Sequence, residues 1–409
     1  MIVSCKDRKF DLTISAPPSK SVYHRELIVR FLCGDKENIS ENPLDNDDIC
    51  ATKACLRALA CAGDKGEVIL PCNESGSTLR FMIPVAAAFL LRGEERRDIT
   101  IVFETKGRLF DRPLDELTKA LNEHGVVVEK DAATRTIRVS GAMTSGEYTI
   151  DGGVSSQYIS GLLMALPLFD EECSIIVTGE AKSVGYIGLT LNALRKYGCN
   201  VSCDNNVYKT DNPGYGNKPE GKVEVEGDWS NGAFLLCLAQ AAYGIINVKG
   251  LNDESAQGDK AIKNFLRECK LNEGAKVEFD CKDIPDIVPY MAINAAFIFE
   301  KAVFNGIGRL RIKESDRVKA IREQLAAIGV RTEETEDTLT VYEYDEGLYK
   351  TGQSGDEPIS ISSYHDHRMA MTAILIAAWL EAEVDIDDTD CINKSFPELL
   401  GIIGKEMKP

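Results

Sequence analysis

A polar segment followed by an apolar helix recurs six times along the chain, and this recurrence restricts the fold more than any other feature of the sequence. The first copy runs from Pro18 to Arg25 and leads into the apolar run 27–32. The other five begin near residues 75, 155, 228, 285 and 365. Counted from Lys20, Gly76 and Ser155, the fourth, fifth and sixth copies follow after 209, 210 and 211 residues. We therefore expect two halves built on one plan.

A second unit lies between these starts, an amphipathic helix that ends at a glycine and is followed by a β-branched strand. Residues 117–128 are the clearest case, with Gly125 between Leu121 and the run 126–128. Segments 191–201 and 321–330 repeat it, and segments 56–68 and 262–277 are looser copies that contain Gly63 and Gly274. Glycine supplies the left-handed conformation that ends a helix. Helices and strands should therefore alternate, three times per half, which places the chain in the α/β class.

The local sequence indicates where the boundaries between the two halves lie. Residues 1–17 resemble a pair of strands, because apolar and polar residues alternate over 10–15. Pro17-Pro18 then predicts a stiff crossing, and a strand is expected at 222–225 before a second crossing near Gly227. The predicted domains are residues 1–18 plus 227–409, and residues 19–226.

Composition excludes several classes of protein. A chain of 409 residues with 44% hydrophobic residues can bury a sizeable core, and its formal net charge of −18 disfavours nucleic acid and anionic membranes as partners. The longest apolar runs, 81–91 and 369–380, are too short to cross a bilayer. The N-terminus has no pattern of a signal or transit peptide, so we expect a chain that begins at Met1.

The cysteines and histidines indicate neither disulfides nor a metal site. Thirteen cysteines form no Cys-x-x-Cys pair, and residues such as Cys55, Cys61 and Cys237 lie in apolar contexts typical of core thiols. A reducing cytoplasm is therefore favoured. His365 and His367 resemble a ligand pair, but no further ligands cluster near them in the sequence and Arg368 would oppose a cation. We expect no metal and no cofactor.

Positive charge gathers at the helix starts of this acidic chain. Residues 309–317 hold four cations and two carboxylates, and further cations lie at or near other starts or in equivalent loops: Lys20, Arg25, Arg80, Arg112, Arg368 and Lys394. A solvated, ion-paired helix start would explain 309–317 alone. The whole set favours an anionic ligand, because helix N-termini attract anions and arginine pairs bidentately with phosphate and carboxylate. Two such substrates would need this many cations.

Five segments together resemble the 5-enolpyruvylshikimate 3-phosphate synthase family: 18–21, 155–157, 312–317, 366–370 and 394–397. Lys313-Glu314-Ser315-Asp316-Arg317 and Asp366-His367-Arg368-Met369-Ala370 are specific in combination, and the match runs over nearly the whole chain. The resemblance implies a two-domain inside-out α/β barrel. Each domain would hold three βαβαββ-like units, with helix N-termini facing the interdomain cleft. It also implies a target of glyphosate.

The implied reaction moves the enolpyruvyl group of phosphoenolpyruvate to the 5-hydroxyl of shikimate 3-phosphate and releases phosphate, on the pathway to chorismate and aromatic amino acids. By resemblance, the catalytic residues are Asp286 as base, Glu314 as methylene acid, Lys20 as proton shuttle and His367 as support for Glu314. The residues implied for shikimate 3-phosphate are Lys20, Ser21, Arg25, Ser155, Ser156, Gln157, Ser183, Asp286 and Lys313. Those implied for phosphoenolpyruvate are Lys20, Gly76, Arg112, Gln157, Arg317, Arg368 and Lys394. The first group belongs mainly to domain 19–226, and the catalytic pair Asp286 and Glu314 to the other.

Several alternatives stay open at this point. Asp286 could cap the helix that follows it, and Glu314 could be one arm of an ion pair. Glu74 stands where the family more often has asparagine, and its carboxylate would repel phosphoenolpyruvate unless it turned away or was paired. Arg309 stands where the family often has asparagine, so its role is open.

Two other functions compete with this one. The first is the related transferase that acts on UDP-N-acetylglucosamine with a loop cysteine, but the equivalent loop 103–113 has none. The second is a non-catalytic anion-binding relative, which the retained Asp286 and Glu314 disfavour. The expected partners are small anionic substrates, and the chain is expected to be a monomer.

Overall fold

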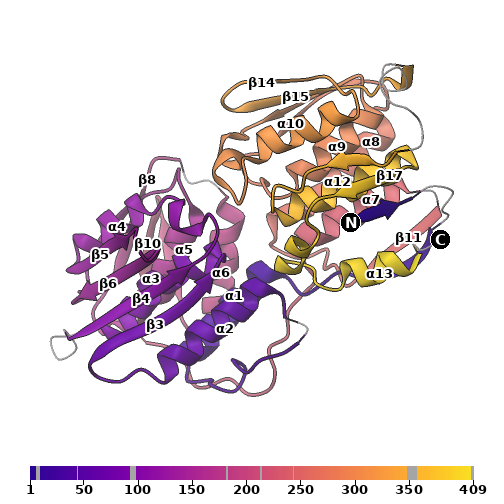
Figure 1. Ribbon diagram of the computed structural model, residues 1–409. Coiled ribbons are helices and arrows are strands. Elements are labelled where there is room, and N and C mark those ends of the chain that lie inside the picture. The colour runs from indigo at the N-terminus through magenta and orange to yellow at the C-terminus, as the bar shows by residue number, and fades with distance from the viewer. Residues whose placement is uncertain are drawn as a thin grey trace. The chain divides into compact units, whose positions relative to one another are not determined.

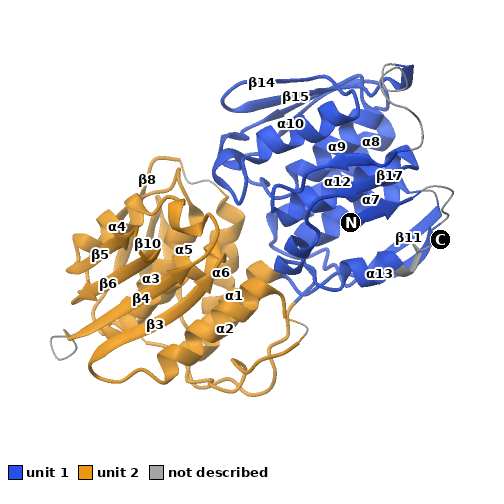
Figure 2. Cartoon of the chain, viewed as in Figure 1, with its two compact units in different colours: residues 1–19, 226–409 blue, residues 20–225 orange. Residues whose placement is uncertain are grey.

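The chain divides into two compact units. Its structure, a computed structural model, describes residues 1–5, 10–43, 45–92, 98–180, 183–211, 214–242, 244–347 and 357–406 (Figure 1). Unit 1 comprises residues 1–19 and 226–409, and unit 2 comprises residues 20–225 (Figure 2). The boundaries expected from the sequence each differ from these by one residue.

Unit 2 contains two four-stranded sheets of identical topology. Its elements are α1 (Lys20–Leu32), α2 (Asp47–Ala60), β3 (Gly66–Asn73), α3 (Gly76–Leu90), β4 (Ile99–Thr105), η2 (Leu109–Asp111), α4 (Asp115–Asn122), β5 (Val126–Asp131), β6 (Thr136–Gly141), β7 (Glu147–Asp151), α5 (Ser156–Ala165), η3 (Leu166–Leu168), β8 (Ser174–Thr178), α6 (Val184–Lys196), β9 (Val201–Asp204) and β10 (Val207–Thr210). The sheets have the orders β3-β4-β6-β5 and β7-β8-β10-β9. In each, the first two strands are parallel and the remaining neighbours are antiparallel.

Unit 1 repeats this sheet once and adds two smaller ones. Its elements are β1 (Ile2–Ser4), β2 (Phe10–Ser15), α7 (Trp229–Ala241), β11 (Gly244–Lys249), η4 (Gly258–Ala261), α8 (Ile262–Leu271), β12 (Lys276–Asp280), α9 (Val288–Ile298), β13 (Lys301–Asn305), η5 (Gly308–Ile312), α10 (Arg317–Ala327), β14 (Thr332–Glu334), β15 (Thr338–Tyr342), β16 (Ile359–Ile361), α12 (His367–Leu380), β17 (Glu383–Ile386), η6 (Asp390–Lys394) and α13 (Leu399–Glu406). The sheets are β12-β13-β15-β14, β1-β17-β16 and β11-β2. The βαβαββ order is thus complete three times in the described chain, and the other copies are shorter.

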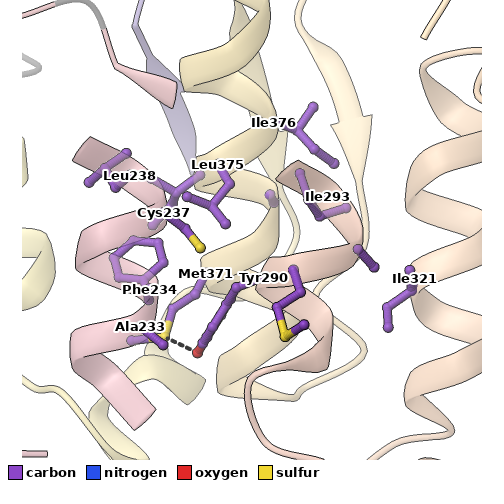
Figure 3. Packing of buried hydrophobic residues seen from close by; sticks show 14 of the residues in the cluster. Ala233, Phe234, Cys237, Leu238, Tyr290, Ile293, Ile321, Met371, Leu375 and Ile376 are labelled. Carbon is purple, nitrogen blue, oxygen red and sulfur yellow. Dashed lines mark hydrogen bonds between the residues drawn. The ribbon is translucent and has the colours of Figure 1, made fainter. Parts of the chain in front are cut away.

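The helices that follow the polar segments form the centre of each unit. Helices α3 and α5 in unit 2, and α7, α9 and α12 in unit 1, are buried on almost every side. In unit 1, side chains of α7, α9 and α12 point toward one another, among them Phe234, Tyr290 and Met371 (Figure 3). Strands such as β15 bury alternate residues, so each sheet turns one face to the helices. A helix that is apolar on every side is stable only when it is surrounded by other elements, as these central helices are.

The two N-terminal strands exist, but they do not pair with each other. Strand β1 lies antiparallel to β17, and β2 lies parallel to β11. The expected alternation in β2 is present, since Phe10 and Ile14 are buried and Asp11 and Thr13 are exposed. Residues 222–225, expected as a strand, are not in one.

Two predictions near α2 were wrong. Helix α2 ends at Ala60, and the left-handed glycine before the next strand is Gly66, with φ 92°, rather than Gly63. Cys61, expected in the core, is exposed just after the helix, whereas Cys55 and Cys237 are fully buried. The connection after α2 is longer than in the other copies, so the glycine that adopts the left-handed conformation lies at the strand rather than at the helix end.

Candidate active site

Helix starts lie where the sequence placed them, and side chains cap most of them. Ser75 accepts a hydrogen bond from the backbone N–H of Thr78 at the start of α3, and Ser155 accepts one from Gln157 at the start of α5. In unit 1, the carboxylates that cap α7, α10 and α12 are Asp228, Asp316 and Asp366. These caps leave other N–H groups of the first turn pointing outward, which favours anions.

In unit 2, two arginines converge on the glycine that begins α3. A Cβ atom added at Gly76 would lie 2.4 Å from Nη1 of Arg112 and 2.9 Å from Nη1 of Arg80. Arg80 donates to Oε1 of Gln157 at 3.2 Å, and Nε2 of Gln157 donates to Ser77 at 2.9 Å. The starts of α3 and α5 therefore lie together and carry two guanidinium groups.

Lys20 begins α1 and pairs with a buried carboxylate. Its Nζ lies 2.8 Å from Oδ2 of Asp48, which is 5% exposed in the first turn of α2. A buried chain of hydrogen bonds runs beside this pair, from His24 through Thr52 and Thr78 to the cap of α3. Three helix starts are therefore held together by polar contacts that are out of water, where each is costly to break.

Arg25 is placed inside unit 2 rather than at its surface. The residue is 2% exposed, and its guanidinium donates to Thr190, Ser160 and the carbonyl oxygens of Ser21 and Tyr186. These contacts use four of its five N–H groups. A single Nη1–H is left for a ligand, so Arg25 mainly holds α1 against α5 and α6.

The serines expected to bind substrate lie at or next to helix starts. Ser155 and Ser156 are 8% and 3% exposed at α5, Ser21 is half-buried in the first turn of α1, and Ser183 is 2% exposed before α6. Ser183 has φ 56°, an unusual conformation for a residue with a side chain. Of its short motif, residues 181 and 182 lie outside the described residues.

In unit 1, one guanidinium gathers three carboxylates. Arg317, 1% exposed, pairs with Asp366 through Nε at 2.8 Å and Nη2 at 3.2 Å, with Asp286 through Nη1 at 2.8 Å, and with Glu314 through Nη2 at 2.9 Å. These partners come from segments 286, 314–317 and 366, which the sequence separates widely. Arg317 therefore brings the expected base and the expected acid to one cation.

Further cations surround the same carboxylates. The Nζ of Lys313 lies 3.3 Å from Oδ1 of Asp286, Nε of Arg368 lies 3.6 Å from that oxygen, and Nζ of Lys394 lies 3.9 Å from Oε1 of Glu314. Burial opposes ionisation of Asp286, but Lys313, Arg368 and Arg317 outweigh it and hold its pKa well below the usual value. Asp286 is therefore ionised at neutral pH.

At Lys313, burial has the larger effect and disfavours the charged ammonium. It lowers the pKa of this ammonium to about 8, with Arg317 and Arg309 acting in the same sense and Asp286 opposing them. Lys313 therefore changes charge within the range in which enzymes are assayed. Arg309 takes part in this electrostatic environment.

The geometry distinguishes between the roles left open for Asp286 and Glu314. Asp286 does not cap α9, which begins at Val288 without a side-chain cap. Glu314 is indeed an arm of an ion pair with Arg317. The two histidines are no ligand pair, because the side chain of His365 is 84% exposed beside Asp388, while that of His367 is 2% exposed with Nδ1 at 3.5 Å from Asp366.

Sequence reasoning left several site residues without a role. Asp48 partners Lys20, Arg80 lies against Gly76, and Asp366 binds Arg317 bidentately. Asp259 in η4 is 3% exposed, and burial together with Asp286 raises its pKa to about 7. The position of Asp366 just before an apolar helix could have identified it as a helix cap. The sequence around Asp48 and Asp259 contains no comparable signal.

Glu74, the departure that raised doubt, is turned toward the following loop. A Cβ atom at Gly107 would lie 2.1 Å from Oε1 of Glu74, so the carboxylate packs against the backbone of Gly107. Gly107 has φ 53° and leaves room for it. The carboxylate is therefore held beside loop 103–113 rather than over Gly76.

Comparison with known proteins assigns the chain to a family. The family model described as EPSP synthase (3-phosphoshikimate 1-carboxyvinyltransferase) matches residues 6–403. The chain belongs to the EPSP synthase family. Two relatives, both called 3-phosphoshikimate 1-carboxyvinyltransferase, are 32% identical over 426 residues in Clostridioides difficile and 33% identical over 416 residues in Clostridium acetobutylicum. Each alignment covers 94% of this chain and 92% of the relative.

Solved structures agree with this assignment at the level of the fold. An EPSP synthase from Acinetobacter baumannii matches with a TM-score of 0.70 and 20% identity, covering 99% of this chain and 98% of that one. The enolpyruvyl transferase NikO from Streptomyces tendae matches with a TM-score of 0.66 and 13% identity, covering 99% and 96%. The two-domain inside-out α/β fold is thereby confirmed. Among the described residues, no helix is long and apolar enough to cross a membrane.

Proposed function

We propose that the chain transfers the enolpyruvyl group of phosphoenolpyruvate to the 5-hydroxyl of shikimate 3-phosphate, with release of phosphate. The observation that carries the proposal is the convergence of Asp286 and Glu314 on Arg317, because addition of a hydroxyl to an enol phosphate needs a base and an acid within reach of one anionic substrate. Membership of the EPSP synthase family supports the same reaction over transfer to UDP-N-acetylglucosamine.

Asp286 serves as the base that takes the proton of the 5-hydroxyl. With three cations around it, its low pKa makes it a weak base. Phosphate and carboxylate groups bound to Lys313, Arg317 and Arg368 neutralise those cations and so raise its basicity. The base would thus become effective when both substrates are in place.

Glu314 serves as the acid that protonates the methylene carbon. Its carboxylate lies between Arg317 and Lys394, and engagement of both cations by phosphoenolpyruvate would release it from those pairs. The product of addition then loses phosphate as one proton of the newly formed methyl group is removed. His367 supports Glu314, and Lys20 contacts the bridging oxygen of the leaving phosphate and exchanges a proton there.

Shikimate 3-phosphate is held by the helix starts of unit 2 and by two residues of unit 1. The contacts are Lys20, Ser21, Arg25, Ser155, Ser156, Gln157, Ser183, Asp286 and Lys313. Support comes from the outward N–H groups at α1, α5 and α6, which suit a phosphate and hydroxyl groups. The domain division follows: residues 19–226 supply most contacts to this substrate.

Phosphoenolpyruvate, which carries a phosphate and a carboxylate, is held mainly by arginines. Unit 2 supplies Lys20, Gly76, Arg112 and Gln157, and unit 1 supplies Arg317, Arg368 and Lys394. The approach of Arg112 to Gly76 supports this set, since an anion at that helix start would meet the guanidinium directly. The enzyme acts as a monomer. It acts in the cytoplasm, and free buried thiols such as Cys237 and Cys281 accord with that reducing compartment.

A phosphate-release assay tests the proposal. Release is expected with phosphoenolpyruvate plus shikimate 3-phosphate, and none with phosphoenolpyruvate plus UDP-N-acetylglucosamine. If phosphate were released only when UDP-N-acetylglucosamine was the acceptor, the chain would be assigned to the related transferase instead. Binding of both ligands without turnover would indicate a non-catalytic relative.

A further inference from the structure

A buried glutamine of unit 1 joins both segments through which the chain passes between its units. The chain leaves unit 1 after Ser19 and returns at Glu226. Gln257 lies just before η4 and is 7% exposed. Its Oε1 accepts from the hydroxyl of Ser19 at 2.8 Å and from the N–H of Trp229 at 3.0 Å. Its Nε2 donates to Oε1 of Glu226 and to the carbonyl of Gly227, each at 2.9 Å.

These four bonds use the full capacity of the amide, two donated and two accepted. A carboxylate of the same shape cannot donate, and an apolar side chain can do neither. Glu226 is held in turn by Ser255 at 2.7 Å and by Asn252 at 3.0 Å. Buried networks in which every group is satisfied fix one geometry, because each unmade bond is costly. Gln257 therefore sets the relative position of the two crossing segments.

The backbones of the crossing segments are also in direct contact. Pro18 and Gly227 form an antiparallel bridge, Ser19 N–H donates to the carbonyl of Glu226 at 2.8 Å, and Asp228 N–H donates to that of Pro17 at 2.8 Å. A Cβ atom at Gly227 would lie 2.3 Å from the carbonyl oxygen of Gly250, so the packing is tight. The residue that follows Ser19 is Lys20, the first residue of α1.

We propose that Gln257 is a positioning residue for Lys20. It acts through the hydroxyl of Ser19 and holds the backbone from which the Lys20 side chain projects. The inference rests on the proposed function, in which Lys20 contacts the leaving phosphate. Loosening the amide displaces Lys20, and displacements of about 1 Å at a reacting group cost on the order of 100-fold in rate. Turnover should suffer more than the binding of shikimate 3-phosphate, because other contacts to that substrate lie along α5 and α6.

The decisive variant is Gln257→Glu. It places a second carboxylate oxygen against Oε1 of Glu226 and the carbonyl of Gly227. The other charged groups on the surrounding segments are Lys20, Asp228, Asp253, Glu254, Asp259 and Lys260. At pH 8, kcat should fall roughly 10- to 100-fold. As the pH falls, the two facing carboxylates share a proton, a donor returns, and kcat relative to wild type should recover. Asn205→Asp, the same amide-to-carboxylate change at an exposed position of unit 2, should behave as wild type.

A second substitution that restores kcat would distinguish a positioning role of Gln257 from a general loss of stability. In Gln257→Glu/Glu226→Gln the amide at 226 can donate to the new carboxylate, so part of the lost kcat should return. Ser19→Ala removes one hydrogen bond with little risk to folding and should lower kcat more than the affinity for shikimate 3-phosphate. It decides the matter if Gln257→Glu does not fold. Wild-type kcat in Ser19→Ala, or a loss in Gln257→Glu that neither lower pH nor the second change reduces, would overturn the proposal. A wild-type enzyme without phosphate release would instead overturn the function on which it rests.

Discussion

At the scale of single residues, the position of Glu314 allows its chemical role to be separated from its ion pair. Glu314→Gln keeps a hydrogen-bond acceptor for Nη2 of Arg317, which now lies at 2.9 Å, but it removes the transferable proton. Turnover should fall by roughly 100-fold or more, the range of a lost general acid, while the affinity for shikimate 3-phosphate stays nearly unchanged. Steady-state kinetics and calorimetric titration measure the two quantities.

Glu300→Gln is the matched control, because Glu300 is exposed and pairs with Lys276 on the surface of unit 1. It should turn over as wild type. Normal turnover in Glu314→Gln would reduce the 313–317 segment to an ion-paired helix start and move the proton transfer to Lys20 or His367.

Gly76 presents a steric prediction. The methyl group of Gly76→Ala would lie 2.4 Å from Nη1 of Arg112, so the guanidinium has to shift. Because a charged hydrogen bond to an anion is worth about 1.5–3 kcal/mol, the KM for phosphoenolpyruvate should rise at least roughly tenfold. Gly63→Ala serves as the control, since a Cβ atom there meets nothing within 4 Å. An unchanged KM in Gly76→Ala would remove Arg112 and Gly76 from the phosphoenolpyruvate contacts.

The pKa of Lys313, lowered by burial to about 8, predicts a pH-dependent affinity. The ammonium form attracts the anionic substrate, so affinity for shikimate 3-phosphate should fall as the pH rises through about 8. Lys313→Arg keeps a positive charge at every accessible pH and should abolish this step while retaining binding. Lys313→Ala should bind weakly across the range. Titrations between pH 6.5 and 9.5 check all three, and an identical step in Lys313→Arg would assign it to another group.

Local motifs in the sequence predicted candidate site residues but not the partners that hold their side chains. Gly76, Arg317 and Asp286 were recognisable because each belongs to a local motif. The partner of Lys20, Asp48, lies 28 positions away, and the bidentate partner of Arg317, Asp366, lies 49 positions away. Such pairs arise from the packing of helices against one another, which leaves no mark in the local sequence.

At the scale of elements, the turn before α12 carries backbone strain at the site. Tyr364 and His365 both have positive φ angles, 54° and 53°, which cost energy for residues with side chains. Asp387 holds the turn by accepting from the Ser362 hydroxyl at 2.6 Å and from Ser363 N–H at 2.7 Å. Burial opposes ionisation of Asp387, but these bonds outweigh it and lower its pKa to about 2.

Asp387→Asn should therefore destabilise the protein in a pH-dependent manner. The native pKa lies below that of the unfolded chain, about 3.9, so the carboxylate stabilises the fold above that value and the contribution is lost as the pH falls toward 2. At pH 7 the expected loss is about 1 kcal/mol, a small value because the residue is exposed. Denaturant unfolding at pH 7 and pH 3 should show the difference from wild type shrinking at the lower pH. A constant difference would mean that the carboxylate charge does not hold the turn.

Elements were predicted from sequence more reliably than their neighbours in space. All six starts lie within three residues of the observed helices, because caps and apolar runs are local. The partners of β1 and β2 were missed, since β17 and β11 lie more than 200 residues further along the chain. Pairing at such separation depends on the whole fold, and the alternation of residues in β2 shows which face is buried but not which strand lies beside it.

At the scale of the whole molecule, the two units differ in how the chain builds them. Unit 2 is one continuous segment, whereas unit 1 needs residues 1–19 together with 226–409. Residues 20–225, expressed alone, should therefore fold with a cooperative thermal transition in circular dichroism. Non-cooperative melting of this segment would show that unit 2 depends on unit 1.

Residues 226–409 alone should not fold. They lack β1 and β2 and the buried side chains Val3, Phe10 and Ile14, each worth roughly 1.5–3 kcal/mol. That sum approaches the entire stability of a typical domain. Joining residue 19 to residue 226 by a short glycine turn should restore folding, because Pro18 and Gly227 already form an antiparallel bridge. Both tryptophans, Trp229 and Trp379, belong to unit 1, so their fluorescence reports its folding directly. A native-like spectrum and a cooperative transition are expected for the joined chain and not for 226–409; equal stability of the two would show that β1 and β2 are dispensable to the unit.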